Sequence, residues 1–302
     1  MSENAIELHE VTKRFGPKVA VNRVSFTVQE GQCYGLIGPN GAGKTTTFSM
    51  MCGYLFPNEG EIRILGADPG VPGTLKRKVG VLPQDAVLPP AWPVGTLLAY
   101  WARLSGLPDP TREAKQALEK VGLPETWSLP AGALSHGMAK RVSMAQALMG
   151  APPVVFLDEP TAGLDPKIAA AVRQLIREMK GKQTVVVSSH NLQELEELCD
   201  ATAVLDRGNL ITAATMVEMT SSAAEFRVQV ARGNVPLPEV RALPGCKGAT
   251  LDPSGVLTVK FDKTVSPEEM ITRTVGLLIQ REVFILAVSR GHKLEDRVLQ
   301  LT

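Results

Sequence analysis

Short apolar runs recur along the first two thirds of the chain, and each one ends in glycine or polar residues. Four of them are QCYGLIG, RKVGVLPQ, APPVVFLDEP and KQTVVVSSH. Segments with helical periodicity separate the later runs, around residues 97–104, 112–121, 138–149, 168–180 and 192–198. Continuous apolar strands that alternate with helices predict a largely parallel sheet covered on both faces. Ligands of such sheets bind beyond the carboxyl ends of the strands, so the polar tails of these runs are the candidate site.

The two ends of the chain have a different pattern. AIELHEV and VSFTV alternate apolar and polar residues near the start, which is typical of half-buried strands. Beyond about residue 220, EFRVQV, VLTVKF and VFILAV predict three strands, PEEMITRTVGLLIQ an amphipathic helix, and KLEDRVLQLT a short closing helix. We therefore expect an α/β domain over residues 1–220 and a small α+β accessory domain over 221–302, long enough for a modest core of its own.

Composition limits the classes of protein that fit this pattern. The net charge of +1 gives no electrostatic footprint for nucleic acid. No apolar run reaches membrane-spanning length, and the acidic start MSENAIELHE lacks the apolar region of a signal peptide. The four cysteines are scattered and form no C-x-x-C pair, which predicts small buried side chains in a reducing compartment.

The segment GPNGAGKT fits the phosphate-binding pattern G-x-x-x-x-G-K-[ST] and lies between a predicted strand and a predicted helix. In this pattern backbone amides surround the phosphates, Lys44 reaches the β- and γ-phosphates, and the Thr45 hydroxyl can ligate Mg²⁺. Thr46 is equally well interpreted as a further donor or as a plain helix residue. The candidate nucleotide-binding residues of this segment are Gly38, Pro39, Asn40, Gly41, Ala42, Gly43, Lys44, Thr45 and Thr46.

The run VVFLDEP carries two carboxylates to a predicted strand end. Asp158 there can hold Mg²⁺ through a water molecule, and Glu159 is placed to polarise an attacking water. The alternative is a pair of solvated carboxylates capping a loop before Pro160. Because the same chain carries a phosphate-binding loop, the catalytic interpretation is favoured.

In ALSHGMAKR, Ser135, His136 and Gly137 directly precede a predicted helix. One interpretation is a helix cap, since serine is a favoured N-cap residue. The other is that the exposed amides of the helix N-terminus bind an anion. This segment alone favours the cap.

The order of these motifs, followed by TAGLDP, resembles that of the ATP-binding subunits of ABC transporters over residues 1 to about 215. The resemblance implies a P-loop NTPase of the ABC ATPase type. Its sheet core is mostly parallel, with N-terminal antiparallel strands and a helical subdomain at about 86–150. The C-terminal domain resembles, more loosely, the extension on ATPases of ABC-2-type exporters, including the ending LED…LT.

The resemblance also assigns roles to single residues. Phe15 matches the aromatic residue that stacks on adenine, and His190 matches the switch histidine that contacts the γ-phosphate. Gln84 matches the glutamine that senses Mg²⁺ and the permease, and Asp165 matches an aspartate at the dimer interface. The expected catalytic set is therefore Glu159, His190 and Gln84, and the expected Mg²⁺ set is Thr45, Gln84 and Asp158.

LSHGM stands where the family has its signature motif, usually Leu-Ser-Gly-Gly-Gln. Ser135 and Gly137 match the motif, whereas His136 and Met138 depart from it. In the family this segment binds the γ-phosphate held by the opposite subunit, so two ATP molecules lie between two subunits. The resemblance therefore implies that this chain pairs with itself or with a paralogue, and that Ser135, His136, Gly137 and Asp165 contact the partner's ATP.

The implied function is MgATP hydrolysis coupled to an integral-membrane permease, for export, on the cytoplasmic face of the membrane. The alternative is a soluble ABC ATPase that acts on nucleic acid or ribosomes. Such proteins usually carry a long coiled-coil insertion or two motif sets, and this chain has neither, so no nucleic-acid partner is expected. Trp92 and Trp101 are candidates for a permease groove or for the ordinary core of the helical subdomain.

Overall fold

The computed structural model describes residues 4–220, 225–262, 264–290 and 294–301. Residues 221–224, directly after the predicted domain boundary, and the final Thr302 lie outside these ranges. The chain forms two compact units, the first ending at Ala214 and the second spanning Thr215–Leu301. The sequence predicts the boundary between the two domains after residue 220, a few residues later than the structure places it.

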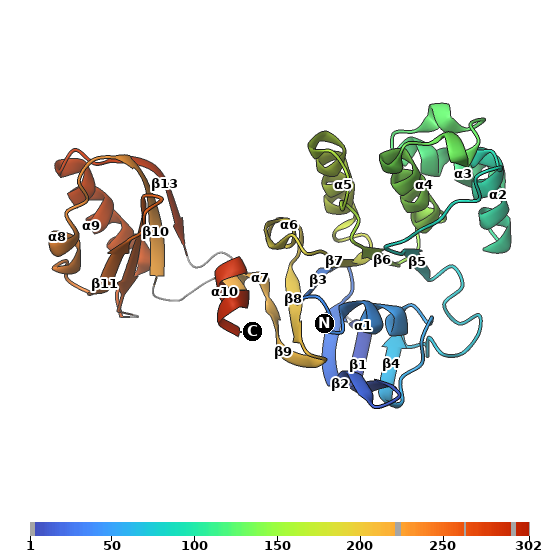
Figure 1. Ribbon diagram of the computed structural model, residues 1–302, viewed down its shortest axis with the longest axis horizontal. Helices are drawn as coiled ribbons and strands as arrows, with labels where there is room; N and C mark the ends of the chain where they lie inside the picture. The colour runs from blue at the N-terminus through green and yellow to red at the C-terminus, as the bar shows by residue number, and fades with distance from the viewer. Residues whose placement is uncertain (1–3, 221–224, 263, 291–293, 302) are drawn as a thin grey trace. The chain divides into compact units, whose positions relative to one another are not determined.

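The main sheet of the first unit has six strands in the order β5-β6-β7-β3-β8-β9 (Figure 1). The strands are β3 (Cys33–Ile37), β5 (Val79–Leu82), β6 (Val154–Asp158), β7 (Thr184–Ser188), β8 (Ala201–Asp206) and β9 (Asn209–Thr215). The pairs β5–β6, β6–β7, β7–β3 and β3–β8 are all parallel. Every residue of β3, β6 and β7 is buried, as the continuous apolar runs predict. The predicted parallel sheet is confirmed.

A second sheet of three antiparallel strands has the order β2-β1-β4. It consists of β1 (Asn4–Phe15), β2 (Lys18–Gln29) and β4 (Glu59–Ile64). Helix α1 (Lys44–Met51) packs against strands of both sheets, and one apolar core joins all three. In that core the ring of Phe48 meets Phe156 edge-on at 5.5 Å. This packing fixes α1 relative to β6.

Five further helices complete the first unit: α2 (Val94–Leu104), α3 (Pro110–Lys120), α4 (His136–Leu148), α5 (Pro166–Met179) and α6 (Leu192–Leu198). Helices α2, α3 and α4 pack on one another, and α4 also packs on β5 and β6 (Figure 1). Helices α3, α4 and α5 begin slightly earlier than their apolar periodicity predicts. Their first turns are set by the capping side chains of Asp109, Ser135 and Asp165.

The second unit is an antiparallel sheet in the order β11-β12-β10-β13 with helices and its own core. Its elements are α7 (Met216–Thr220), β10 (Glu225–Arg232), α8 (Leu237–Arg241), β11 (Cys246–Leu251), β12 (Val256–Phe261), α9 (Pro267–Gln280), β13 (Phe284–Arg290) and α10 (Leu294–Leu301). The expectation of three strands is wrong, because β11 is a fourth. Its pattern is weak, since only Ala249 of the strand is buried.

The expected burial is confirmed for Cys33, Cys52 and Cys199, whereas Cys246 is only half-buried. All four are free, and the fold brings the Sγ atoms of Cys33 and Cys199 to 3.9 Å. Of the helices in the described ranges, none combines the length and the apolar character needed to cross a membrane.

A chain that ends at Thr215 should fold. The buried residues of the first core all lie between Ala5 and Leu205, and those of the second all lie beyond Glu225. We expect one cooperative thermal transition, within about 4 °C of the corresponding transition of the full chain, by circular dichroism. A chain that ends at Leu198 is the control, because it lacks β8 and should not fold. A Thr215 chain without a cooperative transition would contradict the division.

Candidate functional site

Two glycines of the loop between β3 and α1 combine a positive φ with a close approach to other backbone. Gly38 has a φ of 155°, and a Cβ there would come within 2.3 Å of the Leu205 carbonyl oxygen. Gly43 has a φ of 101°, and a Cβ there would lie 2.7 Å from the Ala20 carbonyl oxygen. The glycines of GPNGAGKT therefore allow the close backbone packing that shapes the loop.

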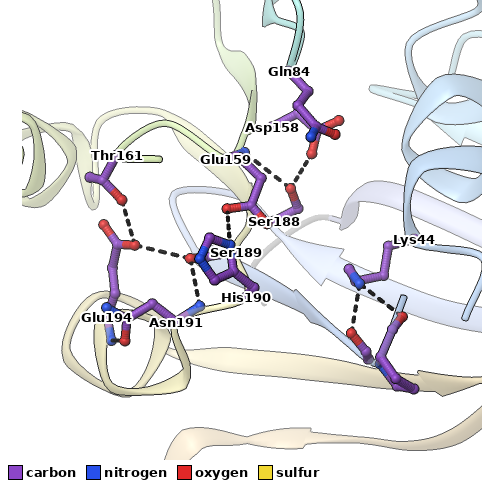
Figure 2. Close-up of polar contacts among 12 residues, drawn as sticks. Lys44, Gln84, Asp158, Glu159, Thr161, Ser188, Ser189, His190, Asn191 and Glu194 are labelled. Carbon is purple, nitrogen blue, oxygen red and sulfur yellow. Dashed lines mark hydrogen bonds and ion pairs between the residues drawn. The ribbon is translucent and has the colours of Figure 1, made fainter. Parts of the chain in front are cut away.

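Lys44, the first residue of α1, reaches back over this loop. Its Nζ donates to the carbonyl oxygens of Gly38 at 2.6 Å and of Pro39 at 3.1 Å (Figure 2). Burial lowers the pKa of Lys44, while the charges of Glu159 and Asp158 act in the opposite direction. The fold thus brings both predicted carboxylates close enough to act on the loop lysine.

The remaining candidates of the loop differ in exposure. Pro39, Asn40, Gly41 and Thr45 are exposed, Thr46 is half-buried and Ala42 is buried. Thr45 and Thr46 lie in the first turn of α1, where amides have no partner further back in the helix. An exposed hydroxyl and free amides at a helix N-terminus suit an anion and its cation.

Asp158 is the last residue of β6 and is 6% exposed. The register of β6 against β7 places it beside Ser188, whose hydroxyl donates to Asp158 Oδ1. Burial raises the pKa of Asp158, although the Ser188 hydrogen bond, Lys140 and Lys44 each act to lower it. The two lysines favour the ionised form of this carboxylate, which is the form that can bind a metal ion.

Glu159 has a left-handed backbone, with a φ of 51°. Its amide donates to Ser188 O at 3.1 Å and lies 3.2 Å from Ser188 Oγ, which holds this costly conformation. Its Oε2 lies 2.8 Å from Nδ1 of His190, two residues beyond β7 (Figure 2). The Glu159 side chain is only 12% exposed, and the His190 side chain is 73% exposed.

Gln84 follows β5, and its side chain is exposed. Its backbone carbonyl accepts a hydrogen bond of 3.4 Å from Lys140 Nζ on α4. Lys140 is 8% exposed, and burial lowers its pKa against the charges of Asp158, Glu159 and Asp85. The sequence analysis missed Lys140 and Ser188. The serine directly follows an apolar run, which is a usable signal, whereas a lysine within a helix gives no sign of burial.

Phe15 ends β1 and is 48% exposed. The ammonium group of Lys13 lies 5.4 Å from the centroid of its ring. A large exposed aromatic ring at a strand end is available to stack on a flat ligand.

Ser135 is the N-cap of α4, and its Oγ accepts a hydrogen bond from the Met138 amide at 3.2 Å. The cap is therefore present, while anion binding stays a prediction. Asp165 caps α5 in the same way, accepting from the amides of Lys167 and Ile168. A Cβ built on Gly163 would lie 3.0 Å from His136 Nε2, so the histidine lies against the turn that leads to Asp165.

A glycine-rich loop between a parallel strand and a helix, its lysine, and an acidic pair at the end of another parallel strand of the same sheet define a P-loop nucleoside triphosphatase. Residues 21–162 match the family model described as ABC transporter. The chain is 34% identical to the Nod factor export ATP-binding protein I of Ralstonia nicotianae, over 98% of this chain and 93% of that protein. It is 40% identical to the protein of the same name from Burkholderia lata, over 68% of this chain and 69% of that protein.

Solved structures agree. The ATP-binding subunit of an ABC transporter superposes with a TM-score of 0.66 at 28% identity, over 71% of this chain and 91% of that one. The chain belongs to the ABC transporter family, as an ATP-binding subunit with ATPase activity. The expected family and fold class are confirmed.

Replacing Asp158 by asparagine should stabilise the protein at neutral pH. The native pKa of Asp158 is raised above its unfolded value of about 3.8, so the native state holds its proton more strongly. The contribution of Asp158 to the free energy of unfolding therefore falls as the pH rises from its unfolded pKa to its native pKa. Above the native pKa, the ionised side chain destabilises the native state. Asp158→Asn removes the cost, and each kcal/mol regained raises Tm by about 2–4 °C in a unit of this size.

Thermal unfolding across the acidic and neutral range, without nucleotide or Mg²⁺, measures the effect. The increase in Tm that Asp158→Asn causes should become smaller as the pH falls toward the usual pKa of aspartate. Asp165→Asn is the control, since it changes an exposed cap to a residue that caps equally well. A lower Tm for Asp158→Asn at neutral pH would show that burial is not the dominant influence on this carboxylate.

Proposed function

We propose that the protein pairs with a second copy of itself, or with a paralogous subunit, around two MgATP molecules. Closure of this pair drives an integral-membrane permease for export, from the cytoplasmic face of the membrane. The observation that carries the proposal is the position of Glu159, bound to His190 and electrostatically coupled to Lys44. Names of the relatives, which include Nod factor export, support the direction of transport.

Within one subunit, the nucleotide would lie between Phe15 and the loop of residues 38–46. The exposed ring of Phe15 stacks on adenine, and the loop amides bind the phosphates. Lys44 exchanges the carbonyl oxygens of Gly38 and Pro39 for phosphate oxygens. Thr45, Gln84 and Asp158 would hold Mg²⁺, Asp158 through a water molecule, and the ion would neutralise phosphate charge.

Hydrolysis needs a base beside the γ-phosphate. The Glu159 amide is held by Ser188 O and Ser188 Oγ, and His190 contacts its carboxylate, which can accept a proton from the attacking water. His190, more exposed than Glu159, contacts that carboxylate and would contact the γ-phosphate of a bound nucleotide. The ion pair or hydrogen bond between them keeps both groups on the same side of the nucleotide.

The second subunit would supply the N-terminus of α4. Ser135 already satisfies the Met138 amide, which leaves the His136 and Gly137 amides without a partner inside the helix. These two donors and the positive end of the helix suit the partner's γ-phosphate. Asp165 lies at the neighbouring helix start, and the Gly137 position packs toward Ile168 of α5. The two helix starts therefore form one surface for the other subunit.

The permease would contact the surface that follows Gln84. Trp92 is 41% exposed and Tyr100 is 46% exposed, and their rings meet edge-on at 5.6 Å. Trp101 is half-buried, which suits the core interpretation better than the groove interpretation for that residue. Exposed aromatic pairs of this kind are typical of protein contacts.

Glu159→Gln tests the proposal. We expect ATP binding to stay unchanged, because Lys44 and its loop hold the nucleotide. Hydrolysis should fall by about 10²–10⁴-fold, the usual effect of losing a general base. The variant should also stay dimeric in MgATP, measured by size-exclusion chromatography with light scattering. Turnover within threefold of the unmodified protein would refute the role of Glu159.

A further inference from the structure

We propose that Glu194 is a positioning residue for ATP hydrolysis, which holds the segments that carry Glu159 and His190 in register. The proposal rests on the roles proposed above for those two residues. Glu194 lies on α6 and is 3% exposed. Burial of a carboxylate destabilises the native state unless hydrogen bonds offset the lost hydration, so the partners of Glu194 need an explanation.

One oxygen of this carboxylate joins two loops. Glu194 Oε2 accepts hydrogen bonds from Thr161 Oγ1 at 2.7 Å and from Ser189 Oγ at 3.0 Å (Figure 2). The other oxygen, Oε1, is buried and makes no hydrogen bond in the described part of the chain. The side chain is thus turned so that a single atom bridges the loop after β6 and the loop after β7.

Helix capping accounts for only half of this arrangement. Asn191 caps α6 by accepting from the Glu194 amide at 3.2 Å. In a capping box the glutamate accepts directly from the N-cap amide. Here the Asn191 amide donates to Ser189 Oγ at 3.1 Å, and that hydroxyl donates onward to Glu194. The relay explains Ser189, but capping gives no reason for the hydrogen bond to Thr161.

Both partners of Glu194 lie next to the proposed catalytic pair. Thr161 is two residues beyond Glu159, and its carbonyl accepts from the Leu164 amide at 3.2 Å in the turn toward Asp165. Ser189 is the residue before His190. Two residues therefore support the contact between Glu159 and His190. Ser188, at the end of β7, binds the Glu159 amide, and Glu194, on α6, binds the two loops that carry the pair. Loss of the bridge would let the two side chains separate while the phosphate-binding loop stays intact.

The test is a split between turnover and affinity. Glu194→Ala should lower kcat at least tenfold and leave the KM for ATP, and ATP binding, within twofold. Glu194→Gln keeps an oxygen that accepts from both hydroxyls, so it should restore kcat to more than a third of the unmodified value. Thr161→Val removes one arm of the bridge at similar volume and should also lower kcat. The Glu194→Ala and Thr161→Val double variant should be no slower than Glu194→Ala alone, because both changes break one network.

Thr126→Val is the control for the threonine change, since the Thr126 hydroxyl also donates one hydrogen bond, of 2.8 Å, to the Leu123 carbonyl, and Thr126 is more deeply buried than Thr161. It should leave kcat unchanged. Normal kcat in Glu194→Ala would overturn the proposal. If Glu194→Ala does not fold, normal kcat in Thr161→Val would overturn it instead. So would a Glu194→Gln variant with unchanged ATP binding that is as slow as Glu194→Ala or Thr161→Val.

Glu159→Gln, measured beside these variants, separates this proposal from the one on which it rests. If kcat is low in Glu159→Gln but normal in Glu194→Ala and Thr161→Val, Glu159 remains the general base and only the role of Glu194 is refuted. A normal Glu159→Gln with a slow Glu194→Ala would overturn the general base and still support the bridge.

Discussion

The parallel pairing of β6 with β7 is the constraint on which the site depends. It sets Asp158 directly beside Ser188 at the carboxyl ends of the two strands. The serine binds the Asp158 carboxylate and the Glu159 amide, so one side chain fixes the candidate metal ligand and turns the chain into the left-handed conformation of the candidate base. His190 then follows β7 at the distance that lets it meet Glu159. A shift of one residue between these strands would separate all of these groups.

This arrangement works against the stability of the isolated subunit. Burial raises the pKa of Asp158 and lowers the pKa values of Lys44 and Lys140. Each shift means that burial destabilises the charged form of the group, which bulk water would solvate better. Glu159 adds a strained backbone, and the Lys44 ammonium group donates hydrogen bonds to neutral carbonyl oxygens of its own loop. Such groups gain partners when a charged ligand arrives. The large core that joins both sheets to α1 provides the stability that tolerates these costs.

Much of the fold follows from the sequence, because continuous apolar runs and helical periodicity are strong local signals. They predict β3, β5, β6 and β7, the start of α1, and all five later helices of the first unit. The strands β4, β8, β9 and β11 are missing from that prediction. Of these, β8 is a buried apolar run that the same reasoning could have found, whereas β11 has a single buried residue. Site residues within motifs were likewise predictable. Ser188, Lys140 and Glu194 were missed because their partners are distant in sequence, and only the packed sheet brings them together.

The central claim is that each ATP site is completed by the partner's α4 N-terminus, and a purified mixed dimer tests it most directly. One subunit carries Ser135→Arg, which blocks the partner's phosphate, and the other carries Lys44→Ala, which removes the loop lysine. With sites built across the dimer, one site loses both elements and the other keeps both. The account predicts ATPase activity in the mixed dimer that neither variant homodimer has. An inactive mixed dimer, or a fully active Ser135→Arg homodimer, would contradict it.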